Sequence, residues 1–133
     1  MSTQAPPFAP LLKEHYVSLT TFRKNGAAVA TPVWFVESKG TIYIGTDATA
    51  GKVKRIRNSG RVTLAPCTAK GKVLGSHVEG QASIVSDQEE IVRVQAALAR
   101  KYDMQFRLIG FFQGIARFLR RRTDNYVYLA IVP

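Results

Sequence analysis

The stretch that decides the fold reads GTDATAGKVKRIRNSGRVTLAPC and spans residues 45–67. It begins at the end of one strand-like run, TIYIGT at 41–46, and leads into another, RVTLAPCT at 61–68. Five cations and no carboxylate lie from Gly51 to Arg61. A short segment between two strands with this composition is typical of a helix that offers positive charge to an anion.

The start of this predicted helix is a natural anion site. Thr49 is expected to cap the helix, which begins near Ala50, and Lys52 and Arg55 then fall on one face because they are three residues apart. A helix N-terminus presents free backbone N–H groups and the positive end of the helix dipole. Fixed donors and two cations together predict a phosphate site.

The composition predicts one globular domain. The chain has 133 residues, of which 46% are hydrophobic and 21% charged, so we assign residues 1–133 to a single domain and expect residues 1–10 to be flexible. Cys67 is the single cysteine; it rules out an intrachain disulfide, fits a reducing compartment and is expected to be a small core residue. The sequence has no signal-like or membrane-spanning apolar run, which favours a cytoplasmic location.

The net charge of +10 is concentrated in two stretches that contain no acidic residue. Such clustering indicates an anionic partner: nucleic acid, an anionic membrane surface or a phosphate-bearing small molecule. A solvated basic face is the alternative. Seven cations lie between Asp47 and Glu79 and five between Asp103 and Asp124, namely Lys52, Lys54, Arg55, Arg57, Arg61, Lys70 and Lys72, then Arg107, Arg117, Arg120, Arg121 and Arg122.

Alternating and β-branched runs predict six strands. The first two form a hairpin whose turn ends in Asn25-Gly26. Pro32 lies within the second run and predicts an edge strand or a bulge there, since proline donates no ladder hydrogen bond. The predicted strands span residues 16–22, 27–37, 41–46, 61–68, 77–86 and 125–132.

Two longer segments have helical periodicity. A capping box that starts at Ser86 precedes a helix over 87–102, whose apolar face is Ile91, Val94, Leu98 and Tyr102. The segment 108–122 is aromatic on one side and basic at its end. We expect it to pack on the barrel or in a subunit interface; a membrane-surface helix is the alternative.

The ordered series TPVWF, GTDATAGKVKRIRNSGRVTLAPC and VEGQASIVSDQEE resembles the split-barrel flavin and deazaflavin oxidoreductases related to pyridoxamine 5'-phosphate oxidase. The resemblance covers about residues 16–102. Within that superfamily, the sequence more narrowly resembles the F420-dependent members. It implies a mainly β fold with flanking helices, a six-stranded split β-barrel. It also implies a homodimer that holds its cofactor at the interface.

The resemblance also implies a set of cofactor contacts. The backbone of one strand would run beside the ring system, a second strand would contact the ring or ribityl chain, and two cations would bind the phosphate. An aromatic residue in a strand is also a common core residue, so Trp34 has either role. Lys54 and Arg57 point elsewhere and either meet an acidic tail or face solvent. The implied contacts are Thr31, Pro32, Val33 and Trp34, then Gly45 and Thr46, then Lys52 and Arg55.

Two departures from the flavin-binding members bear on the cofactor. Thr31 and Gly51 stand where those members typically carry arginine, which disfavours FMN. Coenzyme F420 has a phosphodiester and a tail of glutamates, and a broad basic field suits it better. The resemblance then implies hydride transfer between F420 and a small organic substrate, with reduction of that substrate favoured, and with no protein residue as catalytic acid or base. The substrate remains open.

Other functions are weighed against this one. An FMN-dependent oxidase or reductase of the same fold is the nearest alternative, and a carrier that binds the deazaflavin without a substrate is another. A nucleic-acid-binding small β-barrel would stack bases on Tyr16, Phe22, Trp34 or Tyr43. His15 and His77 are far apart in sequence and lack nearby partners, so we predict no metal site and find no support for a haem ligand.

Overall fold

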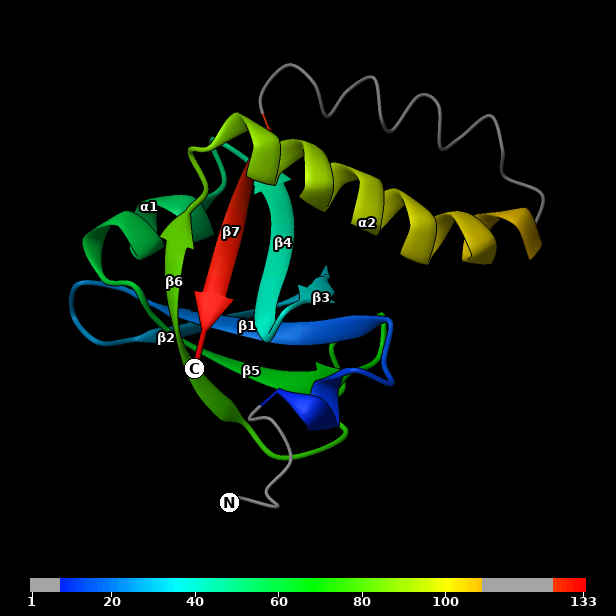
Figure 1. The fold of residues 1–133 in the computed structure, drawn as a ribbon. Coiled ribbons are helices and arrows are strands. Elements are labelled where there is room, and N and C mark those ends of the chain that lie inside the picture. Colours follow the sequence, from blue (N-terminus) through cyan, green and yellow to red (C-terminus); the bar gives the residue numbers. More distant parts are fainter. Residues whose placement is uncertain (1–7, 109–125) are drawn as a thin grey trace, which may run out of the picture.

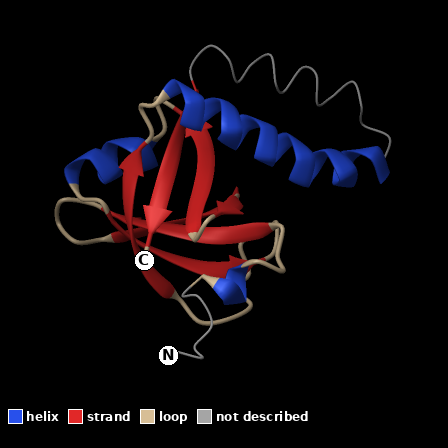
Figure 2. Cartoon of the chain, viewed as in Figure 1, coloured by secondary structure: helices blue, strands red, loops and turns tan. Residues whose placement is uncertain are grey.

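The computed structural model describes residues 8–108 and 126–133, with the side chains of 103–108 left aside (Figure 1). It is a curled antiparallel sheet with two α-helices and a short 3₁₀ helix (Figure 2). The elements are η1 (Ala9–Leu11), β1 (Tyr16–Phe22), β2 (Ala28–Trp34), β3 (Val36–Ser38), β4 (Thr41–Asp47), α1 (Gly51–Asn58), β5 (Arg61–Cys67), β6 (Val78–Ile84), α2 (Gln88–Leu108) and β7 (Tyr126–Val132).

The sheet curls because its two edges belong to consecutive pieces of chain. The strand order is β2-β1-β5-β6-β7-β4-β3, and only Phe35 separates edge strand β2 from edge strand β3. The sheet must therefore bend until those edges approach each other, and β2 contacts β4 where they do. This confirms the predicted split-barrel class. The predicted strand 27–37 is divided at Phe35, which gives seven strands instead of six.

The first hairpin forms as predicted. Gly26 has a φ of 88°, a value that glycine adopts freely, and the Asn25 side chain accepts a hydrogen bond from the Ala27 N–H at 3.0 Å. Pro32 pairs with Ser18 in unbroken register. The edge position predicted from Pro32 is confirmed, while the irregularity lies three residues further on, at Phe35.

Two apolar clusters lie on opposite faces of the sheet. The first fills the barrel and includes Phe8, Leu19, Ile44 and Leu129. Phe8 is buried, so the folded part of the chain includes residue 8, within the segment 1–10 that we expected to be flexible. Cys67 is buried in β5, as predicted. In the described part of the chain, no helix has the length and apolar character to cross a bilayer.

The second cluster lies between α2 and the outer face of the sheet. Val94, Leu98 and Tyr102 are buried and Ile91 packs against them, which confirms the predicted apolar face. The cap differs from the prediction by one residue. Asp87 caps the helix through an oxygen that accepts from the Glu90 N–H at 3.3 Å, in place of Ser86.

Helix α2 also continues past the predicted end at residue 102 to Leu108. The aromatic and basic segment predicted at 108–122 lies outside the described residues beyond that point.

Helix α1 lies where the basic stretch predicted it, between β4 and β5. Its N-cap residue is Ala50, which makes no side-chain cap. The Thr49 cap was wrong, because the Thr49 hydroxyl donates at 2.6 Å to Asp47 Oδ1 in the preceding turn. Val53 and Ile56 are buried and fix the helix against the sheet, so the cations between them face outward or sideways.

Candidate functional site

One cavity gathers most of the predicted cofactor contacts. Its volume is about 270 Å³, and it lies where the ends of β1 and β2 meet β4, α1 and the start of β7. Strand pairing explains the placement, because Tyr16 pairs with Trp34 and Asp47 pairs with Tyr126. The lining residues are Tyr16, Pro32, Val33, Trp34, Gly45, Thr46, Lys52 and Tyr126.

Six of the eight predicted contacts therefore lie around one cavity: Pro32, Val33, Trp34, Gly45, Thr46 and Lys52. Thr31 does not line it; this residue pairs with Leu19 in the middle of the β1/β2 hairpin. Sequence reasoning did not include Tyr126, and it named Tyr16 only as a base-stacking residue. An aromatic residue at the first position of each of these strands was the available signal.

Lys52 is the charged group of this cavity. Its side chain is half-buried, and its pKa is lowered, first by burial and then by the nearby charge of Arg55. The ion pair between Arg61 and Glu79 is the only salt bridge within residues 8–102 and 126–133, so Lys52 has no carboxylate partner in that part of the chain. An ammonium group that is partly desolvated, close to a second cation and unpaired is suited to bind an anion.

Arg55 extends toward Thr21 of β1 and away from the cavity of Lys52. Its Nε donates to Thr21 Oγ1 at 2.5 Å, and its guanidinium folds back over the start of the helix. A Cβ atom on Gly51 would lie 2.8 Å from a terminal nitrogen of Arg55, a distance that real Cβ contacts do not reach. Gly51 thus provides the space that the Arg55 guanidinium occupies.

The Arg55 guanidinium lines a second cavity, of about 400 Å³, between α1 and the β1/β2 turn. Lys52 and Arg55 were expected to hold one phosphate together, but they line two different cavities, each of which includes residues of α1. Lys54, expected to point elsewhere, lines the second one, and Arg57 is exposed. We call this second cavity the basic cavity; it is lined by Phe22, Arg23, Lys24, Gly51, Lys54, Arg55 and Asn58, four of which are cations and none of which is acidic.

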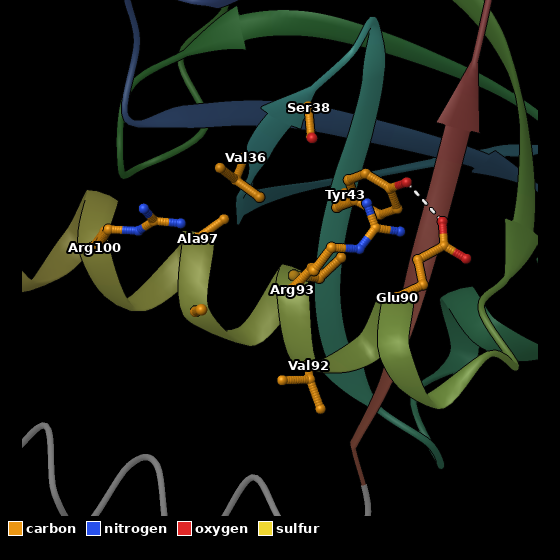
Figure 3. Close-up of a pocket in the computed structure, with 10 residues that line it drawn as sticks. Val36, Ser38, Tyr43, Glu90, Val92, Arg93, Ala97 and Arg100 are labelled. Atoms are coloured by element: carbon orange, nitrogen blue, oxygen red, sulfur yellow. Dashed lines mark hydrogen bonds between the residues drawn. The ribbon is translucent and has the colours of Figure 1, made fainter.

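A third cavity, of about 290 Å³, lies between α2 and strands β3 and β4 (Figure 3). Its walls are mainly apolar and include Val36 and Ala97. The Tyr43 hydroxyl donates at 2.6 Å to Glu90 Oε2, and burial followed by the hydrogen bond to Glu90 raises the pKa of Tyr43. Tyr43 and Glu90 bond to each other, and Arg93 and Arg100 also line this cavity, so positive charge is not confined to the cavities of Lys52 and Arg55.

The aromatic residues proposed to stack bases do not form one open platform. Tyr43 lies buried beneath α2. Trp34 stacks on Tyr102, and Phe22 lies under the Arg61 guanidinium at 4.6 Å. Among the described residues, no group of three metal-binding side chains comes together, and His15 and His77 are both exposed.

Comparison with solved structures places this fold among proteins with different cofactors. An F420 reductase has 16% sequence identity and a TM-score of 0.59, with 92% of this chain and 90% of that one covered. An FAD-binding protein from Mesorhizobium loti has 14% identity, a TM-score of 0.60, and coverage of 92% and 82%. The haem storage protein from Vibrio cholerae has 11% identity, a TM-score of 0.64, and coverage of 91% and 82%. At these identities the likeness shows the fold alone.

No curated protein sequence matches the chain significantly. The family model described as pyridoxamine 5'-phosphate oxidase, in contrast, matches residues 8–125, which is most of the sequence. The chain therefore belongs to the pyridoxamine 5'-phosphate oxidase family, whose flavin-binding split-barrel fold its strands adopt.

Proposed function

We propose that this protein is an oxidoreductase that uses coenzyme F420 to transfer a hydride to a small organic substrate. The observation that carries the proposal is the half-buried Lys52, which has no carboxylate partner among the described residues, in a cavity built from 32–34 and 45–46. Other residues of the same helix, α1, line a cavity with four cations. The first cavity suits the ring and its phosphate. The second suits further negative charge.

The two cavities together favour F420 over FMN. FMN ends in a single phosphate, which Lys52 could hold, and would leave the basic cavity without a ligand. F420 carries carboxylates beyond its phosphodiester, and Arg23, Lys24, Lys54 and Arg55 would meet them. An F420 reductase among the proteins of similar fold is consistent with this choice. An FMN-dependent oxidase or reductase is the second candidate, because this family binds flavins.

The protein's own contribution to the reaction would be binding and orientation. The bound deazaflavin supplies the hydride chemistry. Pro32, Val33 and Trp34 would fix the ring beside the β2 backbone, and Lys52 would neutralise the phosphate. We assign no catalytic acid or base, since the charged side chain of the cavity has this binding role.

A second copy of the chain is expected to complete the site. The single-chain cavity of about 270 Å³ is below the range of about 300–1,000 Å³ that is usual for ligand pockets. A three-ring cofactor would remain largely exposed in it. We therefore propose a homodimer in which the partner covers the open side of the cofactor.

The test is a hydride-transfer assay with chemically reduced F420 and a panel of acceptors, including quinones, enones and nitroaromatic compounds. Loss of the reduced-cofactor signal that requires both protein and acceptor would support the proposal. Tight F420 binding without turnover on any acceptor would favour a carrier. A fragment of single-stranded DNA serves as the control ligand: binding that weakens by orders of magnitude between low and moderate salt would favour the nucleic-acid alternative.

A further inference from the structure

Trp34, a wall of the Lys52 cavity, is held from behind by one residue of α2. Its indole ring is stacked on the Tyr102 ring, with centroids 4.4 Å apart and planes 10° from parallel. On another side it meets Tyr16, a second wall of the same cavity, at 6.4 Å and 59°. The orientation of both aromatic walls therefore depends on what fixes Tyr102.

The Tyr102 hydroxyl is a junction between distant parts of the backbone. It accepts the Phe35 N–H at 2.8 Å, and its single proton lies within reach of two carbonyl oxygens, that of His15 at 2.7 Å and that of Phe35 at 2.8 Å. His15 directly precedes Tyr16, and Phe35 directly follows Trp34. One hydroxyl thus joins the chain at both aromatic walls. This junction lies where the two edges of the sheet meet, at Phe35, which separates β2 from β3.

Lys101 strengthens the same junction. Its Nζ donates to the Phe35 carbonyl at 2.9 Å and lies 3.4 Å from the centre of the Phe35 ring. Tyr102 is almost fully buried, at 2% exposure, so water cannot replace its hydroxyl as a partner for the Phe35 N–H. Two consecutive residues of α2 therefore fix the backbone between β2 and β3.

We infer that Tyr102 is a positioning residue for the cofactor cavity: its ring backs Trp34, and its hydroxyl fixes the backbone beside Trp34 and Tyr16. Tyr102 touches neither the cavity nor, on the proposed function, the cofactor; it acts through Trp34. The link from Trp34 to affinity rests on the proposed function, whereas the link from Tyr102 to Trp34 does not.

The test uses the full chain and Tyr102→Phe, which keeps the ring and removes the hydroxyl. Trp34 is the only tryptophan of the protein, so intrinsic fluorescence reports directly on this wall. Without cofactor, we expect a shifted emission maximum and greater quenching by acrylamide than in the wild type. With F420, we expect the affinity to fall about two- to twelvefold, the range expected if one of the two hydrogen bonds of the hydroxyl contributes to binding through Trp34.

Tyr43→Phe is the matched control. Tyr43 is also a buried tyrosine whose hydroxyl joins the sheet to α2, through Glu90. The Tyr43→Phe substitution should lower the denaturant midpoint about as much as Tyr102→Phe does. It should leave Trp34 emission and F420 affinity unchanged. If Tyr102→Phe changed stability but matched Tyr43→Phe in both readouts, the role of Tyr102 would be structural and the inference would be overturned.

Two further outcomes are separable. If Tyr102→Phe does not fold, the same readouts are applied to Lys101→Met, which removes the hydrogen bond to the Phe35 carbonyl. A smaller shift of the Trp34 emission maximum in the same direction supports the inference. An emission maximum equal to that of the wild type overturns it. If the wild type binds no F420, the proposed function fails, and the emission of cofactor-free Tyr102→Phe still decides whether Tyr102 positions Trp34.

Discussion

Replacing Lys52 with alanine is expected to weaken F420 binding about 10- to 150-fold. The structure gives the reason for a large effect, because the Lys52 ammonium is half-buried in the cavity and has no carboxylate partner among the described residues. A hydrogen bond to a charged group contributes about 1.5–3 kcal/mol, which is the stated factor in affinity. Titration calorimetry or cofactor fluorescence would measure it.

The same residue makes a pH dependence predictable. Burial and Arg55 lower the pKa of Lys52 in the free protein, whereas a bound anion would raise it by favouring the charged form. Binding is then coupled to proton uptake above the free-protein pKa. Affinity should fall as the pH rises through that value, below the pH at which an ordinary lysine titrates. Lys52→Ala should lack this decline.

Lys54→Ala is the comparison, because it removes the same charge from an exposed residue that lines the basic cavity and not the cavity of Lys52. Exposed ion pairs contribute about 0–1 kcal/mol, so the loss should be at most about fivefold. Equal and mild losses for Lys52→Ala and Lys54→Ala would refute the reasoning, since affinity would then depend on the general field and not on a docked phosphate.

Three further predictions concern Arg55, Lys101 and the oligomeric state. Gly51→Ala should displace the Arg55 guanidinium, whose nitrogen lies 2.8 Å from the added Cβ, and should weaken F420 binding but not FMN binding; equal effects on both would contradict the assignment of the basic cavity to the tail. Burial lowers the pKa of Lys101 from 10.5 to about 8, so between these values the unfolded chain binds more protons and the free energy of unfolding should rise with pH. In urea melts Lys101→Met should lack this rise, and parallel pH profiles would show that Lys101 is not desolvated. Sedimentation at micromolar concentration should give about twice the chain mass, and a monomer with bound cofactor would contradict a site shared between copies.

Local patterns in the sequence predicted the elements, and for specific reasons. Asn25-Gly26 specifies a tight turn, and the 3.6-residue spacing of Val94, Leu98 and Tyr102 specifies a buried helix face. These signals depend on neighbours within one or two turns of chain. The strand and helix around the basic stretch were predictable in the same way.

The features that the sequence did not predict depend on contacts between distant segments of the chain. The break at Phe35 follows from closure of the sheet and from the bond that its N–H makes to Tyr102, 67 residues away. Arg55 and Lys52 share a helix face, yet the hydrogen bond to Thr21 holds the Arg55 side chain in a different cavity from that of Lys52. Helical spacing fixes where a side chain starts but not which partner its far end finds.

The most direct test of the central claim is the affinity of the wild-type protein for F420 and FMN at two salt concentrations. The cavity of Lys52 and the basic cavity on the same helix predict tighter F420 binding by at least about tenfold at low salt, a difference of about 1.4 kcal/mol. Salt should reduce this advantage by screening the tail, without abolishing it. Equal or tighter binding of FMN at low salt would contradict the account and identify the protein as a flavin-dependent member of its family.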